Sequence, residues 1–144
     1  MNTEEIIIKK FHPDPFYFLS FYFSGFVIIV LGFVLILFFS WLIFASLLTA
    51  GLLIFILAEV SRRAETFYLL DGGIAREYRL FSTSREFAEY EKIQNIKINQ
   101  SFVENIFDIG NLKFDTAGGD KTEVNFRGVK NPYEIESTVR EKMK

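Results

Sequence analysis

The chain has 144 residues, of which 18 are acidic and 16 are basic, and it contains no Cys and one His. The absence of Cys excludes a disulfide framework and any Cys-based metal or redox site. The formal net charge of -2 lacks the basic excess that is typical of a nucleic-acid-binding protein. The length suits one compact domain of about 100 residues together with a smaller element.

One apolar stretch dominates the first half of the chain, because residues 15–58 contain no Asp, Glu, Lys, Arg or His. A membrane-spanning helix takes about 20 apolar residues, so this stretch predicts two spans, at 16–38 and 41–60, joined by a tight turn. At ~1.5 Å rise per residue each predicted helix is roughly 30 Å long, which matches the hydrocarbon core of a bilayer.

Two other interpretations of this stretch are disfavoured. A buried helical hairpin of a soluble protein carries charges on its outer faces, and the predicted helices have none before Glu59, at the end of the second. A cleaved signal peptide has an apolar region of only ~7–15 residues. The lack of ionisable residues also disfavours a channel or transporter role for this chain alone, because ion and proton pathways normally use them.

Basic residues flank the apolar stretch, and they predict its orientation. Lys9 and Lys10 precede the first span. Arg62 and Arg63 follow the second, whereas the turn carries no Lys or Arg. The positive-inside rule therefore predicts that both termini are cytoplasmic. With two interfacial aromatic residues added, the predicted membrane-interface anchors are Lys9, Lys10, Tyr17, Trp41, Arg62 and Arg63. The predicted organisation is a cytoplasmic tail at 1–15, a two-span hairpin at 16–60 and a cytoplasmic domain at 61–144.

Small residues in the two spans offer surfaces for close helix packing. Their spacing does not form a clean small-xxx-small dimerisation motif, so we expect them to make contacts inside the hairpin first. These residues are Ser24, Gly25, Gly32, Ser46, Thr49 and Gly51.

After the hairpin the sequence changes to short segments in which apolar and polar residues alternate, separated by Gly-rich turns at 71–73 and 118–120. This pattern predicts an antiparallel meander that forms a half-barrel or sandwich. The predicted strands are 66–70, 74–81, 85–90, 93–101, 111–117 and 122–127.

The chain ends in a predicted amphipathic helix. Asn131 is the expected N-cap, and Glu134 completes a pattern that is similar to a capping box. Ile135, Val139 and Met143 recur every four residues and form one apolar stripe. We expect this helix to cover an open end or an exposed edge of the sheet.

Several segments in this order carry a family resemblance: His12-Pro13 and residues 66–74, 91–101, 109–114, 116–119 and 129–135. Together they resemble the membrane-anchored pleckstrin-homology-like (PH-like) proteins of bacteria and archaea, the YdbS-like group. The resemblance implies an α+β PH-like domain, an incomplete antiparallel barrel of about six or seven strands capped by the C-terminal helix. It implies a binding or assembly module and no catalytic residue. Residues 81–84 depart from the family pattern, which leaves the strand register around 81–91 open.

No enzyme motif of the G-x-S-x-G, H-E-x-x-H or P-loop type occurs in the chain. We therefore predict no catalytic residue, no cofactor, no metal, no nucleic-acid partner and no small-molecule substrate. His12 is assigned a solvated or interfacial role. The Gly-rich segments are interpreted as turns, where Gly supplies positive φ, rather than as phosphate-binding loops.

Three arginines, Arg76, Arg79 and Arg85, lie in the first predicted β-hairpin after the spans. The resemblance makes them candidate contacts for a lipid headgroup, because phosphoinositide-binding PH domains carry basic side chains in that hairpin. Each cation near an anionic leaflet is worth about 1 kcal/mol. Glu77 and Glu86 lie close to them in the sequence and oppose this role.

The function expected first is protein–protein assembly at the membrane, including self-association, because the predicted fold offers a sheet edge and a groove beside the terminal helix. Two alternatives stay open. One is sensing of anionic lipid headgroups by the PH-like domain, and the other is a role as an accessory subunit of a larger membrane complex. The expected partners are membrane lipids and either a second copy or another membrane protein.

Overall fold

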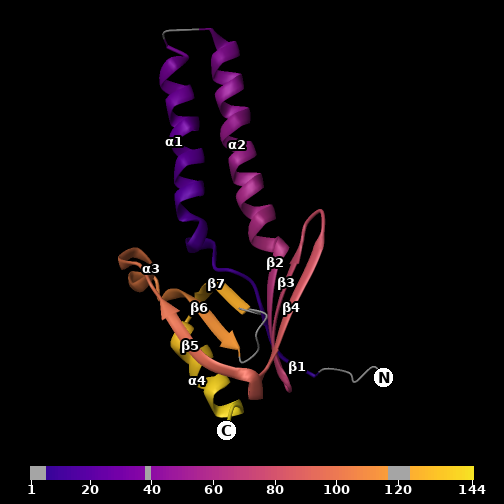
Figure 1. Ribbon diagram of the computed structural model, residues 1–144. Helices are drawn as coiled ribbons and strands as arrows, with labels where there is room; N and C mark the ends of the chain where they lie inside the picture. The colour runs from indigo at the N-terminus through magenta and orange to yellow at the C-terminus, as the bar shows by residue number, and fades with distance from the viewer. Residues whose placement is uncertain (1–5, 38–39, 117–123) are drawn as a thin grey trace.

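A computed structural model describes residues 6–37, 40–116 and 124–144 of the chain (Figure 1). Two long helices form a projecting hairpin, and two antiparallel sheets and a last helix form the domain beneath it. The elements are β1 (Ile7–Phe11), η1 (Pro15–Phe18), α1 (Leu19–Leu35), α2 (Trp41–Ala64), β2 (Glu65–Leu70), β3 (Gly73–Arg79), β4 (Thr83–Glu89), η2 (Tyr90–Lys92), β5 (Ile93–Asn99), α3 (Phe102–Ile106), β6 (Ile109–Thr116), β7 (Val124–Lys130) and α4 (Pro132–Lys142).

The hairpin of α1 and α2 is long and apolar enough to cross a membrane, and little of it is buried inside the structure. Its helices approach closely where Gly25 faces Gly51. A Cβ on Gly51 would lie only 2.5 Å from Cγ1 of Ile29 and 2.9 Å from the carbonyl oxygen of Gly25. The expectation that small residues serve contacts inside the hairpin is confirmed at these positions.

The second helix is longer than the sequence analysis predicted, because α2 continues to Ala64 and passes directly into β2. Glu59 explains the extra turn. Its carboxylate accepts hydrogen bonds from Arg62 and Arg63, three and four residues further along the same helix. Ion pairs at this spacing stabilise a helix, which is consistent with the continuation of α2 past the end of the apolar stretch. Part of the predicted turn between the helices lies outside the described residues.

The domain contains two antiparallel sheets, one in the order β1-β2-β3-β4 and the other in the order β5-β6-β7. All six strands that the sequence analysis placed after the hairpin are present, with ends shifted by at most three residues. The open register in the β3–β4 region is now defined, because Gly73 pairs with Glu89 and Arg79 with Thr83. The predicted turn at 118–120 lies outside the described residues.

The seventh strand, β1, lies before the hairpin, in a segment to which the sequence analysis assigned no secondary structure. It pairs antiparallel with β2, and Phe11 lies opposite Phe67. Three consecutive Ile followed by two Lys do not alternate, so β1 has no strand signature of its own. Its pairing with β2 means that residues on both sides of the hairpin build one sheet.

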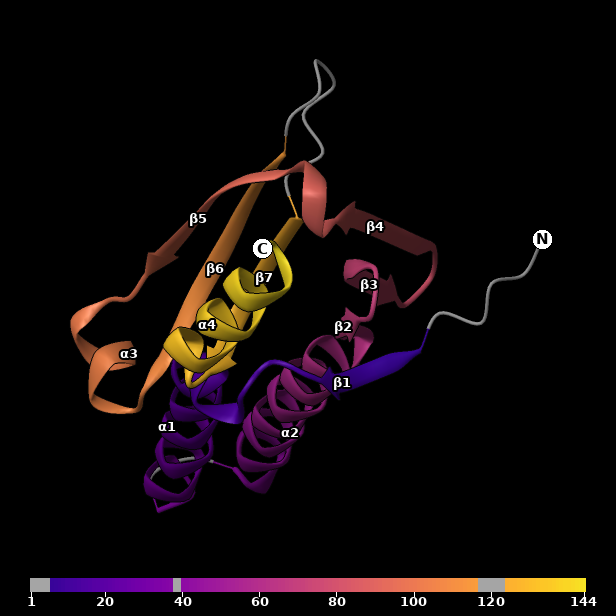
Figure 2. The same cartoon turned by 90° about the horizontal axis from the view of Figure 1, so that it is seen from below.

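The core lies between the two sheets and α4. Its centre is formed by the fully buried Phe67, Phe114 and Phe126, whose rings make tilted and edge-to-face contacts. From α4, the buried Ile135 and Val139 complete it. Both views show α4 on the side of the β5-β6-β7 sheet away from the hairpin (Figures 1 and 2). The prediction that a C-terminal helix caps the sheet is confirmed, and α4 does so across a face of the sheet rather than along an edge.

Two local features differ from the expectations. Asn131 precedes α4, but its backbone is left-handed (φ 50°) and its side chain makes no capping bond to the helix backbone. It donates instead to the Glu134 carboxylate, 3.3 Å away. The short helix α3 was not predicted. It begins directly after Ser101, the last residue of the expected strand, and a capping box between Ser101 and Glu104 starts it.

Candidate functional site

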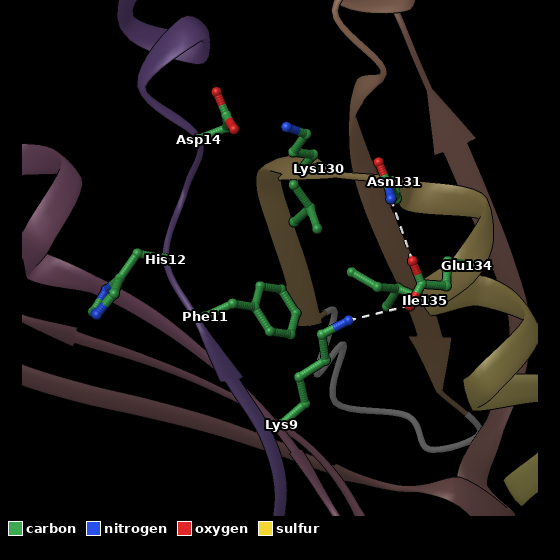
Figure 3. Close-up of a pocket in the computed structure, with 9 residues that line it drawn as sticks. Lys9, Phe11, His12, Asp14, Lys130, Asn131, Glu134 and Ile135 are labelled. Atoms are coloured by element: carbon green, nitrogen blue, oxygen red, sulfur yellow. Dashed lines mark hydrogen bonds and ion pairs between the residues drawn. The ribbon is translucent and has the colours of Figure 1, made fainter.

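A groove runs between β1 and α4, and we call it the β1–α4 groove (Figure 3). It encloses about 230 Å³. Phe11 points into it, whereas His12 points away from it and makes a 2.8 Å hydrogen bond to the carbonyl oxygen of Glu65. The lining residues are Lys9, Phe11, His12, Asp14, Val129, Lys130, Asn131, Glu134 and Ile135.

The groove has an apolar floor and a charged mouth. Phe11 packs against Phe67 and Phe126 of the core, with ring centroids 5.6 and 5.7 Å away. Across the mouth, the Lys9 ammonium lies 3.3 Å from the Glu134 carboxylate. Hydrogen bonds from Asn131 and then Lys9 hold the pKa of Glu134 below its usual range.

The edge of β1 continues this surface. Ile6, Ile7 and Ile8 are all exposed, and within the described residues β1 has only β2 as a neighbouring strand. The backbone groups on the outer side of such a strand lack a strand partner, which makes it a template for an added strand. The groove and this edge together are the candidate site.

A second hollow, of about 270 Å³, lies on the outer face of the β5-β6-β7 sheet, and we call it the Tyr17 groove. It is lined by Tyr17, Asn99, Asn111, Leu112, Lys113, Asn125 and Arg127. The side-chain oxygen of Asn125 is buried and has no hydrogen-bond partner within the described residues. Because α4 covers the opposite face of this sheet, the Tyr17 groove is on the side of the hairpin (Figure 2).

Tyr17, a predicted interface anchor, is held by the domain. Gly128 lies directly against its ring, and a Cβ on Gly128 would lie 2.4 Å from Cγ of Tyr17. Gly128 also has a φ of +60°, and its N–H donates to the Asn111 side chain at 2.9 Å. Asp14 donates its N–H to the Gly128 carbonyl at 2.7 Å. These contacts join the base of the hairpin to β7.

The three arginines that were candidate headgroup contacts lie next to carboxylates. Arg79 is exposed and forms an ion pair with Glu77, which is buried. Arg85 lies opposite Glu77 in the β3–β4 ladder. Arg76 is the most enclosed of the three and is described next. The structure therefore brings the arginines to one β-hairpin together with acidic partners, and their role in lipid binding stays a prediction.

Arg76 is held between two carboxylates, from β2 and β4. Its Nε lies 2.5 Å from Glu65, and its Nη1 lies 3.3 Å from Glu86. Only 18% of the Arg76 side chain and 10% of the Glu65 side chain are exposed. Burial by itself lowers the pKa of Arg76, but the attraction and hydrogen bond of Glu65, followed by those of Glu86, outweigh burial and raise the pKa above its ordinary value. Arg76 is therefore partly buried and paired with a carboxylate from each neighbouring strand.

The remaining predicted anchors occupy two regions. On β1, Lys9 contacts Glu134 and the Lys10 ammonium lies 5.6 Å from the centre of the Tyr68 ring, so both are engaged within the domain. Trp41 begins α2 and is exposed, and Arg62 and Arg63 end it. Their role as anchors at a membrane interface stays a prediction.

Of the residues that line the two grooves, only Lys9 and Tyr17 were predicted as site residues; His12, Asn131, Glu134 and Ile135 were named for other roles. One signal was available for the Tyr17 groove. Alternation places Leu112 and Phe126 inward, and it therefore places Lys113 and Arg127 on the opposite face of neighbouring strands. The β1–α4 groove had no such signal, because it joins two segments that are far apart in the sequence.

A family model described as the bacterial PH domain matches residues 15–143, which include the hairpin and nearly the whole domain. The chain therefore belongs to the bacterial PH domain family. Domains of this kind are generally non-catalytic binding modules. No curated protein and no solved structure matches the chain. Among the described residues, no group of three or more His, Asp or Glu is arranged to hold a metal ion.

Proposed function

We propose that this chain is a multi-pass protein of the cell membrane that displays its PH-like domain at the cytoplasmic surface, with both termini in the cytoplasm. The apolar, outward-facing surface of α1 and α2 supports membrane insertion. Arg62 and Arg63 at the domain end of α2 support this orientation. In this arrangement the domain is a protein–protein assembly module, and its first partner is a second copy of the chain.

The observation that carries the assembly proposal is the open edge of β1 beside the β1–α4 groove. A partner segment added to β1 would gain main-chain hydrogen bonds along the edge, and the groove would take its side chains. Ile6, Ile7 and Ile8 supply apolar contacts on both sides of such a strand, because successive side chains alternate. Lys9 and Glu134 supply ionic groups at the rim, which favour one register over others.

The test is the size of the full chain in mild detergent and in nanodiscs, with Ile7→Lys as the edge-blocking variant. Lys on an edge strand opposes strand addition. The matched control is Tyr133→Lys, which adds the same charge at an exposed position on α4. We expect the wild type and Tyr133→Lys to be larger than one copy and Ile7→Lys to be smaller. A wild type that is strictly monomeric and co-purifies with no partner would contradict the proposal.

The same experiment distinguishes the accessory-subunit alternative. In that case the chain purified from native membranes carries one large membrane protein in a fixed ratio. Ile7→Lys then tests whether the β1 edge holds this partner. Retention of the partner by Ile7→Lys would place the contact elsewhere, for example on the outward surface of the hairpin.

A second candidate function is the sensing of anionic lipid headgroups, and the Tyr17 groove is the observation that favours it. Lys113 and Arg127 line this groove on the side of the hairpin, and Arg127 has no ion pair within the described residues. Arg76 and Arg79, by contrast, are matched by carboxylates. The test is thermal unfolding of the full chain in nanodiscs of phosphatidylglycerol against nanodiscs of phosphatidylcholine.

If the Tyr17 groove binds the anionic headgroup, phosphatidylglycerol raises the unfolding temperature, and Arg127→Gln removes the increase. Arg79→Gln is the matched control for the arginines of the β3–β4 hairpin. A loss of the increase in Arg79→Gln but not in Arg127→Gln would return the headgroup role to that hairpin.

A further inference from the structure

The turn between β3 and β4 carries an aromatic side chain that touches almost nothing. Phe81 is 99% exposed, and the neighbouring Leu80 is also exposed. We call residues 80–82 the β3–β4 tip. Figure 1 shows the tip on the side of the hairpin, at the level of the last turns of α2. An apolar pair on a loop tip is unfavourable in water, so its position beside the hairpin requires a reason.

The short helix α3 presents a similar apolar surface. Phe102 is 81% exposed, and Val103 and Ile106 are exposed beside it. The one carboxylate on this helix, Glu104, is turned back onto the domain, where it accepts hydrogen bonds from the Ser101 N–H and from the Asn111 side chain. The α3 apolar face, formed by residues 102, 103 and 106, therefore carries no charge from its own helix.

A stacked aromatic pair ties α3 to the base of the hairpin. The Phe107 ring, just after α3, lies 4.5 Å from the Phe16 ring and is nearly parallel to it. Phe16 belongs to η1, which leads into α1. In both Figure 1 and Figure 2, α3 and the β3–β4 tip lie on opposite sides of the molecule, with the hairpin between them in Figure 1.

The surface between these two apolar points is cationic. The Tyr17 groove lies there on the outer face of the β5-β6-β7 sheet, with Lys113 and Arg127 in its lining. Arg79, the last residue of β3 before the tip, is exposed but forms an ion pair with Glu77, so Lys113 and Arg127 supply the cationic character. Apolar side chains at the edges and cations between them match the interfacial region of an anionic leaflet. The bilayer is favoured over a protein partner because the membrane surrounds a spanning hairpin. One leaflet can therefore contact the β3–β4 tip and the α3 apolar face at the same time.

We propose that the PH-like domain lies against the cytoplasmic leaflet and that the β3–β4 tip and the α3 apolar face insert into its interfacial region on either side of the hairpin. Anionic headgroups then lie over the Tyr17 groove. This inference rests on the proposed membrane location of the hairpin but does not depend on self-association. It makes the domain a rigid extension of the membrane anchor, with its β1 edge facing the cytoplasm at a defined height.

The test uses indole fluorescence of the full chain in vesicles of phosphatidylglycerol and phosphatidylcholine whose acyl chains carry bromine close to the headgroup. The chain has one Trp, Trp41, so Trp41→Phe provides a silent background. Phe81→Trp and Phe102→Trp each place an indole on one apolar point. The matched control is Tyr133→Trp, because Tyr133 is 60% exposed on α4, away from the hairpin.

We expect a blue shift and bromine quenching for the indoles at positions 81 and 102, and water-like, unquenched emission at position 133. Quenching of Trp41 in the wild type reports hairpin insertion independently. Quenched Trp41 with water-like emission at positions 81 and 102 would overturn this inference and leave the membrane location intact. A blue shift without bromine quenching would also overturn it, because protein would then cover these side chains. Unquenched Trp41 would overturn the membrane location itself.

Discussion

Replacing Arg76 with Ala tests whether this arginine is a structural cation or a ligand-binding one. The substitution leaves the Glu65 carboxylate, 10% exposed, without the guanidinium that lies 2.5 Å away. Removing one partner of a buried ion pair costs roughly 3–5 kcal/mol, because the other charge stays buried without compensation. The free energy of unfolding of a domain is about 5–15 kcal/mol, so the loss takes a large part of the stability.

The assay is a urea titration of the full chain in mild detergent, followed by pulse proteolysis. Arg140→Ala is the matched control, because Arg140 forms an exposed pair with Glu136 on α4 and such pairs are worth about 0–1 kcal/mol. We expect Arg76→Ala to lower the unfolding midpoint far more than Arg140→Ala. The double variant Glu65→Leu with Arg76→Met should recover most of the loss, because it removes both buried charges. Equal effects of Arg76→Ala and Arg140→Ala would refute a structural role.

Three further predictions concern the hairpin, its junction with the domain and the groove mouth. Gly51→Leu should lower the thermal midpoint of the full chain in detergent, because a Cβ at Gly51 meets Ile29 at 2.5 Å, whereas Leu53→Ala on the outward face should change it little. Gly128→Ala should destabilise the junction by about 1–2 kcal/mol or more, because φ is +60° and Tyr17 blocks a Cβ. The control in a proteolysis assay is Gly72→Ala, where a Cβ has open space. Equal protease sensitivity of the two variants would contradict the packing argument. The Glu134 pKa is lowered, so its contribution to stability is present above the ordinary pKa and is lost as the pH falls through the lowered one. An NMR titration should show that Lys9→Gln moves this pKa back toward its ordinary value, and an unchanged pKa would mean that Lys9 does not act on Glu134.

The hairpin could be predicted from the sequence because its signal is local. Residues 15–58 contain no Asp, Glu, Lys, Arg or His, and a segment of this kind predicts two long apolar helices without any knowledge of what surrounds it. The six strands after it were also local, since alternation and Gly-rich turns are properties of neighbouring residues. The C-terminal helix followed from its apolar stripe in the same way.

Long-range pairing decided the features that carry the proposed function. The sequence of β1 has no strand pattern. It forms a strand only because it pairs with β2, which follows the whole hairpin in the sequence. The β1–α4 groove lies between segments that are far apart in the sequence, as the contact of Lys9 with Glu134 across 125 positions shows. Pairing between segments so far apart produces no hydrophobic periodicity among neighbouring residues, so it cannot be predicted from a short stretch of sequence.

The three arginines of the β3–β4 hairpin show most clearly what the sequence predicts and what only the pairing of strands decides. Their position in the sequence suggested a cationic surface. Glu77 and Glu86 lie nearby in the sequence, but this alone did not show which arginine each carboxylate would pair with. The strand register then placed Glu65 from β2 against Arg76 and Glu86 from β4 on its other side, so this arginine is paired within the chain. The sequence by itself determines which charged residues the β3–β4 hairpin carries. The pairing of the strands decides how far apart these charges lie, and therefore which of them can reach a partner outside the chain.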